Sequence, residues 1–240
     1  GTAATFTGMH RPLLNDYQVS SIESLYGLIV SANKNEYTKL NGTICKGKNA
    51  ITISESVPDV SLSNIDNDKS VFGVISAIED QNVRRDDYGG LISKFEGETG
   101  DMRTFINSLG EGAIWVSNKN PINLESGDYI TSSSIPGYGM KQSDDVLHNY
   151  TVAKITMDCN FNPQTQPVKE ILKDSDGNNI LDANGFIQWT DSSTLTEQKY
   201  DLRYLLPDGT QITQSEYDTK LANNETVYKA AFVGCTYHCG

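Results

Sequence analysis

The stretch from Asn107 to Cys159 constrains the fold most strongly, because it is a succession of short β-forming segments separated by turn sequences. Ala113–Val116 is apolar and rich in strand-favouring residues, and residues 149–157 alternate apolar and polar side chains as a half-buried strand does. Ser126–Asp128 and Pro136–Gly139 are typical turn sequences. The stretch therefore predicts consecutive short strands joined by turns.

Continuous apolar runs predict buried strands elsewhere in the chain. Gly73 lies inside one of these runs and predicts a bulge or a close backbone approach. Tyr37–Leu40 is expected to form a hairpin with the run before it, and Asn41-Gly42 is a strong turn dipeptide. The predicted core strands are Leu25–Ala32, Val71–Ile78, Ala113–Val116, Tyr129–Thr131, Tyr150–Met157 and Val227–Val233.

Residues 160–224 have a different character. Turn chemistry predicts hairpins around Asp174–Gly177 and Pro207–Gly209. Ser215–Asn223 is the best helical candidate, with Ser215 as its N-cap. We therefore predict an all-β fold with a barrel-like or sandwich core, a hairpin-rich insertion and at most one short helix. The core would comprise residues 1–159 and 225–240, and the insertion residues 160–224.

The composition argues against two classes of partner. The 240 residues carry a formal net charge of −12, whereas phosphate contacts need clustered Lys and Arg, so neither nucleic acid nor an anionic membrane surface is expected. No apolar run approaches the roughly 20 residues of a membrane-spanning helix. The hydrophobic fraction of 37% is low for a compact globule. Long hairpins or an elongated, partly oligomeric molecule would account for it.

The sharpest local feature is a group of candidate zinc ligands near the end of the chain. Cys235, His238 and Cys239 are residue types that zinc binds in a tetrahedral array. Further ligands would have to come from Cys159, His10 or a neighbouring subunit. A disulfide to Cys159 and plain packing of reduced thiols are the alternatives, and four unevenly spaced cysteines are too few for a disulfide scaffold. No other cofactor is expected.

Acidic residues offer the other candidate chemistry. The segment Asp174–Asn179 resembles a calcium loop, but its twelfth position is Gly185, so a polar hairpin turn is the better interpretation. A pair of carboxyl groups could support hydrolysis if one activates water while the other stays protonated. His148 is expected to be a structural histidine rather than a base. The candidate acids are Glu111, Asp128, Asp144 and Asp145.

The spacing of the turns and strands resembles a known β-module. Residues 127–133, 136–140 and 151–154 are similar to the pattern G-D-x-[I/L]-x-T-S, P-G-x-[A/G]-M and [V/L]-[G/A]-K of a module at the C-terminal ends of phage and giant-virus fibre and appendage proteins. More distantly, the chain resembles the peptidase-G2-like intramolecular chaperone domains. Further matching segments are Phe6–Arg11, Gly27–Val30, Val71–Ser76 and Phe232–Gly240.

The resemblance implies a β-rich homotrimer that helps an upstream fibre shaft to find its register, located in the virion after assembly in the host cytoplasm. A shaft with register-dependent, non-local pairing folds slowly, and an end domain that trimerises first raises the local concentration of its strands. Some relatives cut themselves free. Neither a serine–lysine dyad nor the G2-type catalytic acids match here, so no catalytic residue is assigned.

The expected function is therefore a C-terminal trimerisation or intramolecular-chaperone domain rather than an enzyme. One alternative is a self-cleaving endopeptidase that uses acidic residues. The other is a fibre tip that binds a host-surface glycan or protein through an aromatic groove, with Tyr138, Trp189 and Tyr204 as candidates.

Overall fold

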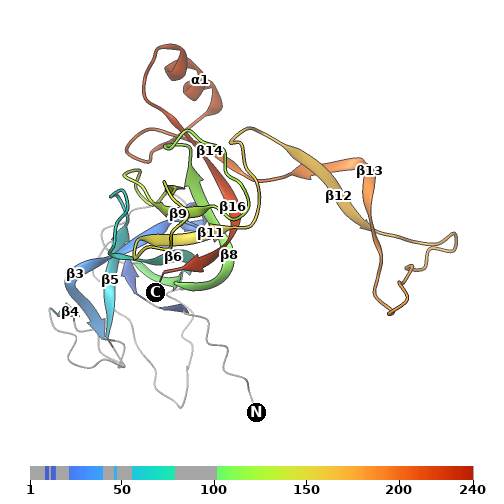
Figure 1. The fold of residues 1–240 in the computed structure, drawn as a ribbon, viewed down its shortest axis with the longest axis horizontal. Helices are drawn as coiled ribbons and strands as arrows, with labels where there is room; N and C mark the ends of the chain where they lie inside the picture. Colours follow the sequence, from blue (N-terminus) through green and yellow to red (C-terminus); the bar gives the residue numbers. More distant parts are fainter. Residues whose placement is uncertain are drawn as a thin grey trace. The chain divides into compact units, whose positions relative to one another are not determined.

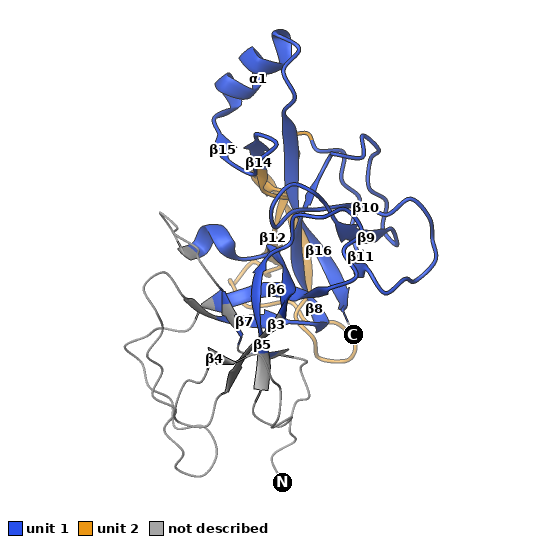
Figure 2. Cartoon of the chain, turned by 90° about the vertical axis from the view of Figure 1, so that its left-hand side faces the viewer, with its two compact units in different colours: residues 1–161, 203–240 blue, residues 162–202 orange. Residues whose placement is uncertain are grey.

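The structure is a computed structural model that describes residues 9–10, 12–14, 22–39, 46–47, 56–78 and 102–239 (Figure 1). These residues form sixteen strands, one 3-10 helix and one α-helix, which confirms the predicted all-β class. The chain divides into two compact units (Figure 2). Unit 1 contains residues 1–161 and 203–240, and unit 2 contains residues 162–202.

The first sheet of unit 1 closes on itself. The pairing order β7–β2–β5–β3–β6 returns to β7, so five of its strands form a small barrel-like ring. β1 and β4 extend the sheet beyond this ring. The strands are β1 (Met9–His10), β2 (Leu13–Leu14), β3 (Ile29–Lys39), β4 (Lys46–Gly47), β5 (Ser56–Leu62), β6 (Val71–Ile78) and β7 (Met102–Asn107).

The second sheet contains most of the stretch between Asn107 and Cys159. Its order β11–β9–β10–β8–β16 also returns to β11, and β14 and β15 continue from β16. The longest pairing joins β8 and β16 from Ala230 opposite Ser117 to His238 opposite Leu109. The strands are β8 (Leu109–Ser117), β9 (Tyr129–Ser132), β10 (Gly139–Lys141), β11 (Thr151–Ile155), β14 (Leu202–Leu205), β15 (Gln211–Ile212) and β16 (Tyr228–His238).

Both sheets contribute to one hydrophobic core. Fully burying one Leu or Ile side chain stabilises the folded state by roughly 1.5–3 kcal/mol, so this core is the main source of stability of unit 1. Tyr26, Leu62 and Phe232 pack against it from the side. The buried cluster consists of Leu14, Leu25, Leu28, Val30, Val60, Ile75, Ile106, Trp115, Ile135, Tyr138, Leu205 and Ala230.

Gly73 has both properties that its place in a buried strand predicts. The register between β3 and β6 shifts here, since Val30 lies opposite Gly73 whereas Ser31 lies opposite Val71. A Cβ atom on Gly73 would lie 2.5 Å from the backbone oxygen of Asn107 on the neighbouring β7. The bulge and the close approach together leave room only for glycine.

The predicted strand Leu25–Ala32 begins later than its apolar pattern suggests. Its first residue ends the 3-10 helix η1 (Ile22–Leu25), and Gly27 then adopts a left-handed φ of +83°. The strand starts at Ile29 and continues to Lys39, so Tyr37 lies within the same strand instead of forming the expected hairpin partner. The Asn41-Gly42 turn lies outside the described residues.

The predicted helix exists, but its N-cap is different. Helix α1 (Gln214–Ala222) begins after Thr213, whose side chain accepts from the backbone N–H of Glu216 at 3.2 Å. The Glu216 carboxylate accepts in return from the N–H of Thr213 at 2.8 Å. This reciprocal capping box satisfies two donors at once, whereas Ser215 as cap would satisfy only one. No helix in the described ranges is long and apolar enough to cross a membrane.

Unit 2 is a two-stranded antiparallel ribbon of β12 (Thr165–Ile171) and β13 (Trp189–Gln198). It is shorter than the predicted insertion 160–224, because residues 160–161 and 203–224 belong to unit 1. Arg203 accounts for this boundary. Its guanidinium group lies 3.8 Å from the centre of the Trp115 ring and donates to the backbone oxygen of Ser24 at 2.9 Å.

Candidate functional site

The turns at Ser126–Asp128 and Pro136–Gly139, which carry the pattern that resembles the viral β-module, connect parts of the core. Gly137, with φ +81°, donates from its N–H to the oxygen of Ser63 at 2.7 Å, and its own oxygen accepts from Ile29 at 2.8 Å. The N–H of Gly127 donates to the oxygen of Ile155 at 2.9 Å. The Gly137 bonds join the loop between β9 and β10 to β3 and to the residue that follows β5, and the Gly127 bond joins the turn before β9 to β11. Both turns therefore have a structural role.

A buried polar cluster, which no sequence motif indicated, surrounds Asp68. Its carboxylate accepts from the hydroxyls of Ser31 and Ser70 at 2.5 Å each, and its N–H donates to the hydroxyl of Ser132 at 2.8 Å. Burial by itself raises the pKa of Asp68, but the hydrogen bonds from Ser31 and Ser70 outweigh it and hold the pKa below its ordinary value. Asp68 thus links β3, through its carboxylate, to β9, through its backbone N–H.

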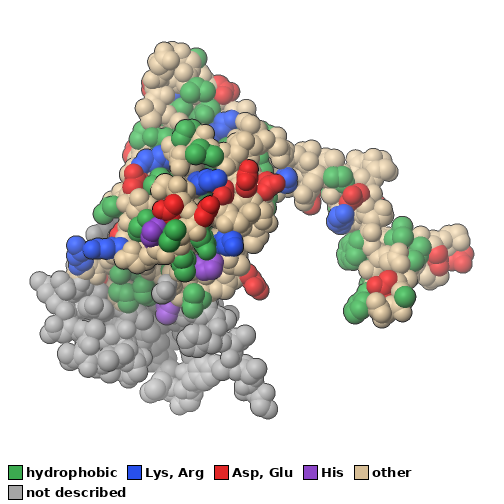
Figure 3. Space-filling model, in the orientation of Figure 1, with side chains coloured by type: hydrophobic (Ala, Val, Ile, Leu, Met, Phe, Trp, Pro, Cys, Tyr) green, Lys and Arg blue, Asp and Glu red, His purple; other side chains and the backbone are tan. Residues whose placement is uncertain are grey.

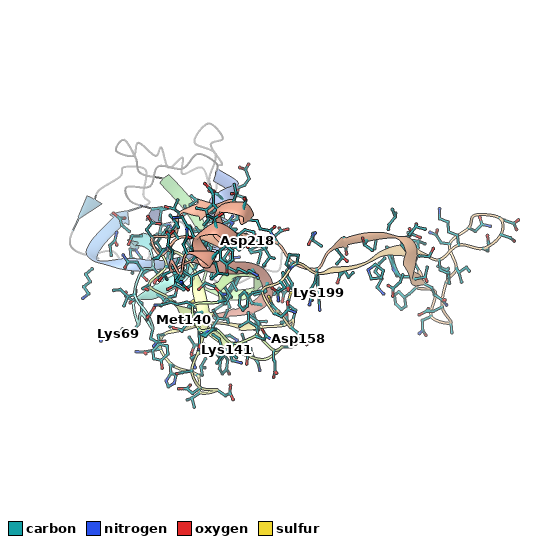
Figure 4. The ribbon with its side chains drawn as sticks, turned by 90° about the horizontal axis from the view of Figure 1, so that it is seen from above. Lys69, Met140, Lys141, Asp158, Lys199 and Asp218 are labelled. Carbon is teal, nitrogen blue, oxygen red and sulfur yellow. The ribbon has the colours of Figure 1, made fainter. Side chains whose placement is uncertain are left out.

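The candidate acids do not show the environment of a catalytic pair. Glu111 and Asp145 are exposed, and Asp128 forms an ion pair with Lys141 at 2.7 Å (Lys141 is labelled in Figure 4). Hydrogen bonds from the N–H of Val146 and from His148 lower the pKa of Asp144. A carboxyl group that stays protonated for acid catalysis needs the opposite shift.

His148 and Asp144 belong to a loop that Gln142 organises. The buried Gln142 amide donates to the oxygen of Val146 at 2.7 Å and accepts from the hydroxyl of Thr151 at 2.7 Å. His148 places Nε2 3.0 Å from the Asp144 carboxylate and stacks on the Tyr150 ring at 4.6 Å. These contacts fix the shape of the loop between β10 and β11.

The candidate zinc ligands lie on opposite faces of β16. Cys235 and Cys239 are buried on one face, whereas His238 lies on the other, where its ring nitrogen is 3.2 Å from the Thr236 hydroxyl. Burial raises the pKa of both thiols to about 12, so they are protonated at neutral pH. In the described part of the chain, no three His, Cys, Asp or Glu side chains are grouped for a metal. The zinc site stays a prediction.

The segment that resembles a calcium loop is a tight turn, and the same turn occurs again eight residues later. The Asp174 carboxylate accepts from the N–H groups of Asp176 and Asn178 at 2.9 Å each. The Asp182 carboxylate accepts in the same way from Asn184 at 2.8 Å and Phe186 at 2.9 Å. Gly177 and Gly185 have φ values of +84° and +85°. The first carboxylate is thus occupied by its own turn.

The two turns connect three short segments that bond to one another in a ring. Leu172 donates to the oxygen of Gln188, Ile180 to that of Leu172, and Gln188 to that of Ile180, each at 2.9 Å. Each segment therefore satisfies backbone groups of the other two. This closed arrangement gives the end of unit 2 a defined conformation.

Unit 2 exposes much of its apolar surface. Its buried residues are Ser192 and Tyr200 alone, whereas the side chains of Phe186 and Trp189 are 70% and 59% exposed. Figure 3 shows apolar side chains gathered on the visible face of this unit. A ribbon of this kind buries too little apolar surface to be stable by itself in water. The exposed large hydrophobic residues of the unit are Leu181, Phe186, Ile187, Trp189 and Leu195.

The three aromatic candidates for a glycan groove differ in exposure. Tyr138 is only 3% exposed and its hydroxyl accepts from Arg203 at 3.2 Å, so its ring cannot line a surface groove. Tyr204 packs on Tyr217 with a ring separation of 5.0 Å. Trp189 alone of the three presents an open ring, and it belongs to unit 2.

Comparison with protein-family models, with curated proteins and with solved structures gives no match for this chain.

Proposed function

We propose that this chain is an assembly module, the C-terminal trimerisation and intramolecular-chaperone domain of a fibre or virion appendage protein. The observation that carries the proposal is unit 2. It exposes five large hydrophobic side chains on a ribbon without a core of its own. Apolar side chains that are exposed together in a patch are typical of protein–protein contacts.

The energetics favour covering this surface. Burying one large apolar side chain contributes roughly 1.5–3 kcal/mol, so a few of those in unit 2 offset a substantial part of the entropy lost on association. Unit 1 has an extensive hydrophobic core of its own, which unit 2 lacks. Unit 1 therefore supplies a stable fold, and unit 2 supplies the surface for contact.

We infer a chaperone role from this difference between the two units. Three copies joined through their end domains hold the preceding shaft segments close together, which raises the effective concentration of the pairing strands and fixes their register. The partners are then two further copies of the chain and its own upstream shaft, and the place of action is the assembling virion.

The molar mass of the purified chain tests the proposal. Light scattering coupled to size-exclusion chromatography should give three times the 26.4 kDa of one chain. An upstream shaft segment should form a protease-resistant trimer when it is fused to this module. The same segment expressed without the module should not. A monomer at micromolar concentration, with or without the shaft, would overturn the proposal.

A further inference from the structure

The strand edges of unit 2 are poorly suited to pairing with another chain. β12 carries Pro167, which has no N–H to donate, and edge prolines block strand addition. In β13 the register jumps, because Pro167 lies opposite Thr196 and Lys169 opposite Asp191. The extra residues lie in β13, where the Ser192 hydroxyl accepts from the N–H of Leu195 at 3.0 Å. Both edges are therefore interrupted.

One side of the ribbon carries two apolar pairs of facing residues. Ile171 lies directly opposite Trp189, and Leu181 directly opposite Ile187, so the members of each pair share a side. Alternation along the extended chain places Ile187 and Trp189 on the same side. We call this set, Ile171, Leu181, Ile187 and Trp189, the arm face.

The arm face is preorganised. The ring of hydrogen bonds through Leu172, Ile180 and Gln188 holds the three segments together, and the Asp174 and Asp182 carboxylates fix the turns between them. A surface that is already ordered loses little conformational entropy when it is covered.

Charges of both signs border the arm face. Lys169 and Asp191 form an ion pair two residues beyond Ile171 and Trp189, on the same side of the ribbon, and Lys173 follows on that side. The chain as a whole has a net charge of −12, which opposes association between most of its surfaces. The border of the arm face carries charges of both signs, so its lysines and its aspartate can meet the opposite charges of an identical face.

We infer that the arm face is the contact between copies of this chain, with the arm faces of different copies packed against one another rather than joined by strand addition. This inference rests on the proposed assembly function and names the surface that performs it. Lys169 of one copy meets Asp191 of the next, and the apolar side chains lie between these pairs.

Two variants of the full chain test the contact. The double variant Ile187→Ser/Trp189→Ser should raise the dissociation constant of the oligomer at least about a hundredfold in sedimentation equilibrium. The matched control Val146→Ser/Leu147→Ser changes two residues of similar exposure in unit 1 and should assemble as the parent does. Circular dichroism of both variants should match the parent.

A charge exchange tests whether identical faces meet. Lys169→Asp and Asp191→Lys should each weaken assembly when alone, because positions 169 and 191 of every face then carry the same sign of charge. Mixing the two variants should restore assembly in part, since two of the three contacts in a mixed trimer then join an acidic position to a basic one. Restoration requires that Lys169 and Asp191 of different copies lie close together.

Each outcome is decisive. A monomeric parent chain would overturn the proposed function. A parent oligomer that survives Ile187→Ser/Trp189→Ser, or that the Val146→Ser/Leu147→Ser control also dissociates, would overturn the arm-face contact alone. Acrylamide quenching of the unsubstituted chain gives an independent measure, because Trp189 should become protected at high concentration while Trp115 is buried throughout. Unchanged quenching across the dissociation range would contradict the inference.

Discussion

At Asp68, serine hydroxyls from three parts of the chain surround one residue. Those of Ser31, in β3, and Ser70, directly before β6, donate to its carboxylate, and that of Ser132, at the end of β9, accepts from its N–H. Ser70 is a local partner, two residues further along the chain. Ser31 and Ser132 come together with Asp68 only through the packing of the two sheets.

Replacing Asp68 with Asn should lower the free energy of unfolding by about 1–3 kcal/mol at pH 7, because a buried network then loses an acceptor. The pKa of Asp68 in the folded state lies below its ordinary value of 3.8. Its contribution is therefore present above about pH 4 and is lost as the pH falls below that. Urea unfolding at pH 7 and at about pH 3 measures both effects. The exposed Asp145→Asn control should change stability by less than about 0.5 kcal/mol, and an Asp68→Asn variant as stable as the parent at pH 7 would contradict the expectation.

Gly137→Ala should destabilise the protein more than Gly110→Ala does. Both glycines have positive φ, which costs another residue about 1–2 kcal/mol. A Cβ on Gly137 would also lie 3.0 Å from the Cβ of Leu28, whereas a Cβ on Gly110 would have open space. Thermal unfolding should show a midpoint several degrees lower for Gly137→Ala. Equal midpoints would show that Leu28 can move away from the new Cβ atom without loss of stability.

At the scale of elements, α1 shows which features of a helix the local sequence pattern can predict and which it cannot. The helical segment is predictable from its sequence, and the T-x-x-E spacing from Thr213 to Glu216 was available as a capping-box signal. Ser215, the predicted N-cap, lies inside the helix. The strand Val71–Ile78, by contrast, agrees with its apolar run at both ends.

Thr213→Ala should destabilise α1 by about 1 kcal/mol, because the N-cap acceptor and its bond to Glu216 are both lost. Ser215→Ala should have little effect, since alanine has the higher helix propensity at that position. Hydrogen exchange of the α1 amides is the measurement of choice. Faster exchange in Ser215→Ala than in Thr213→Ala would identify Ser215 as the true cap.

For the whole molecule, the division into units predicts that unit 2 is dispensable for folding but required for assembly. The ends of the ribbon lie side by side, since the backbone N–H of Lys199 donates to the backbone oxygen of Gln164 at 2.9 Å. Replacing residues 165–198 with a short Gly-Ser linker should therefore leave unit 1 folded with a cooperative thermal transition. The same variant should be monomeric by light scattering. Loss of the cooperative transition would show that unit 1 depends on the ribbon.

The sequence by itself determined the all-β class, most strand positions, the turns and the glycine at the bulge, because alternation, apolar runs and turn residues are local properties of the chain. Tertiary structure alone decided that each large sheet closes into a ring, that Ser31 and Ser132 meet Asp68, and that β16 continues to His238, which thereby faces away from Cys235 and Cys239. It also decided that the apolar residues of unit 2 stay exposed. Pairing between distant strands and burial against distant side chains depend on the whole chain, so a local pattern cannot specify them.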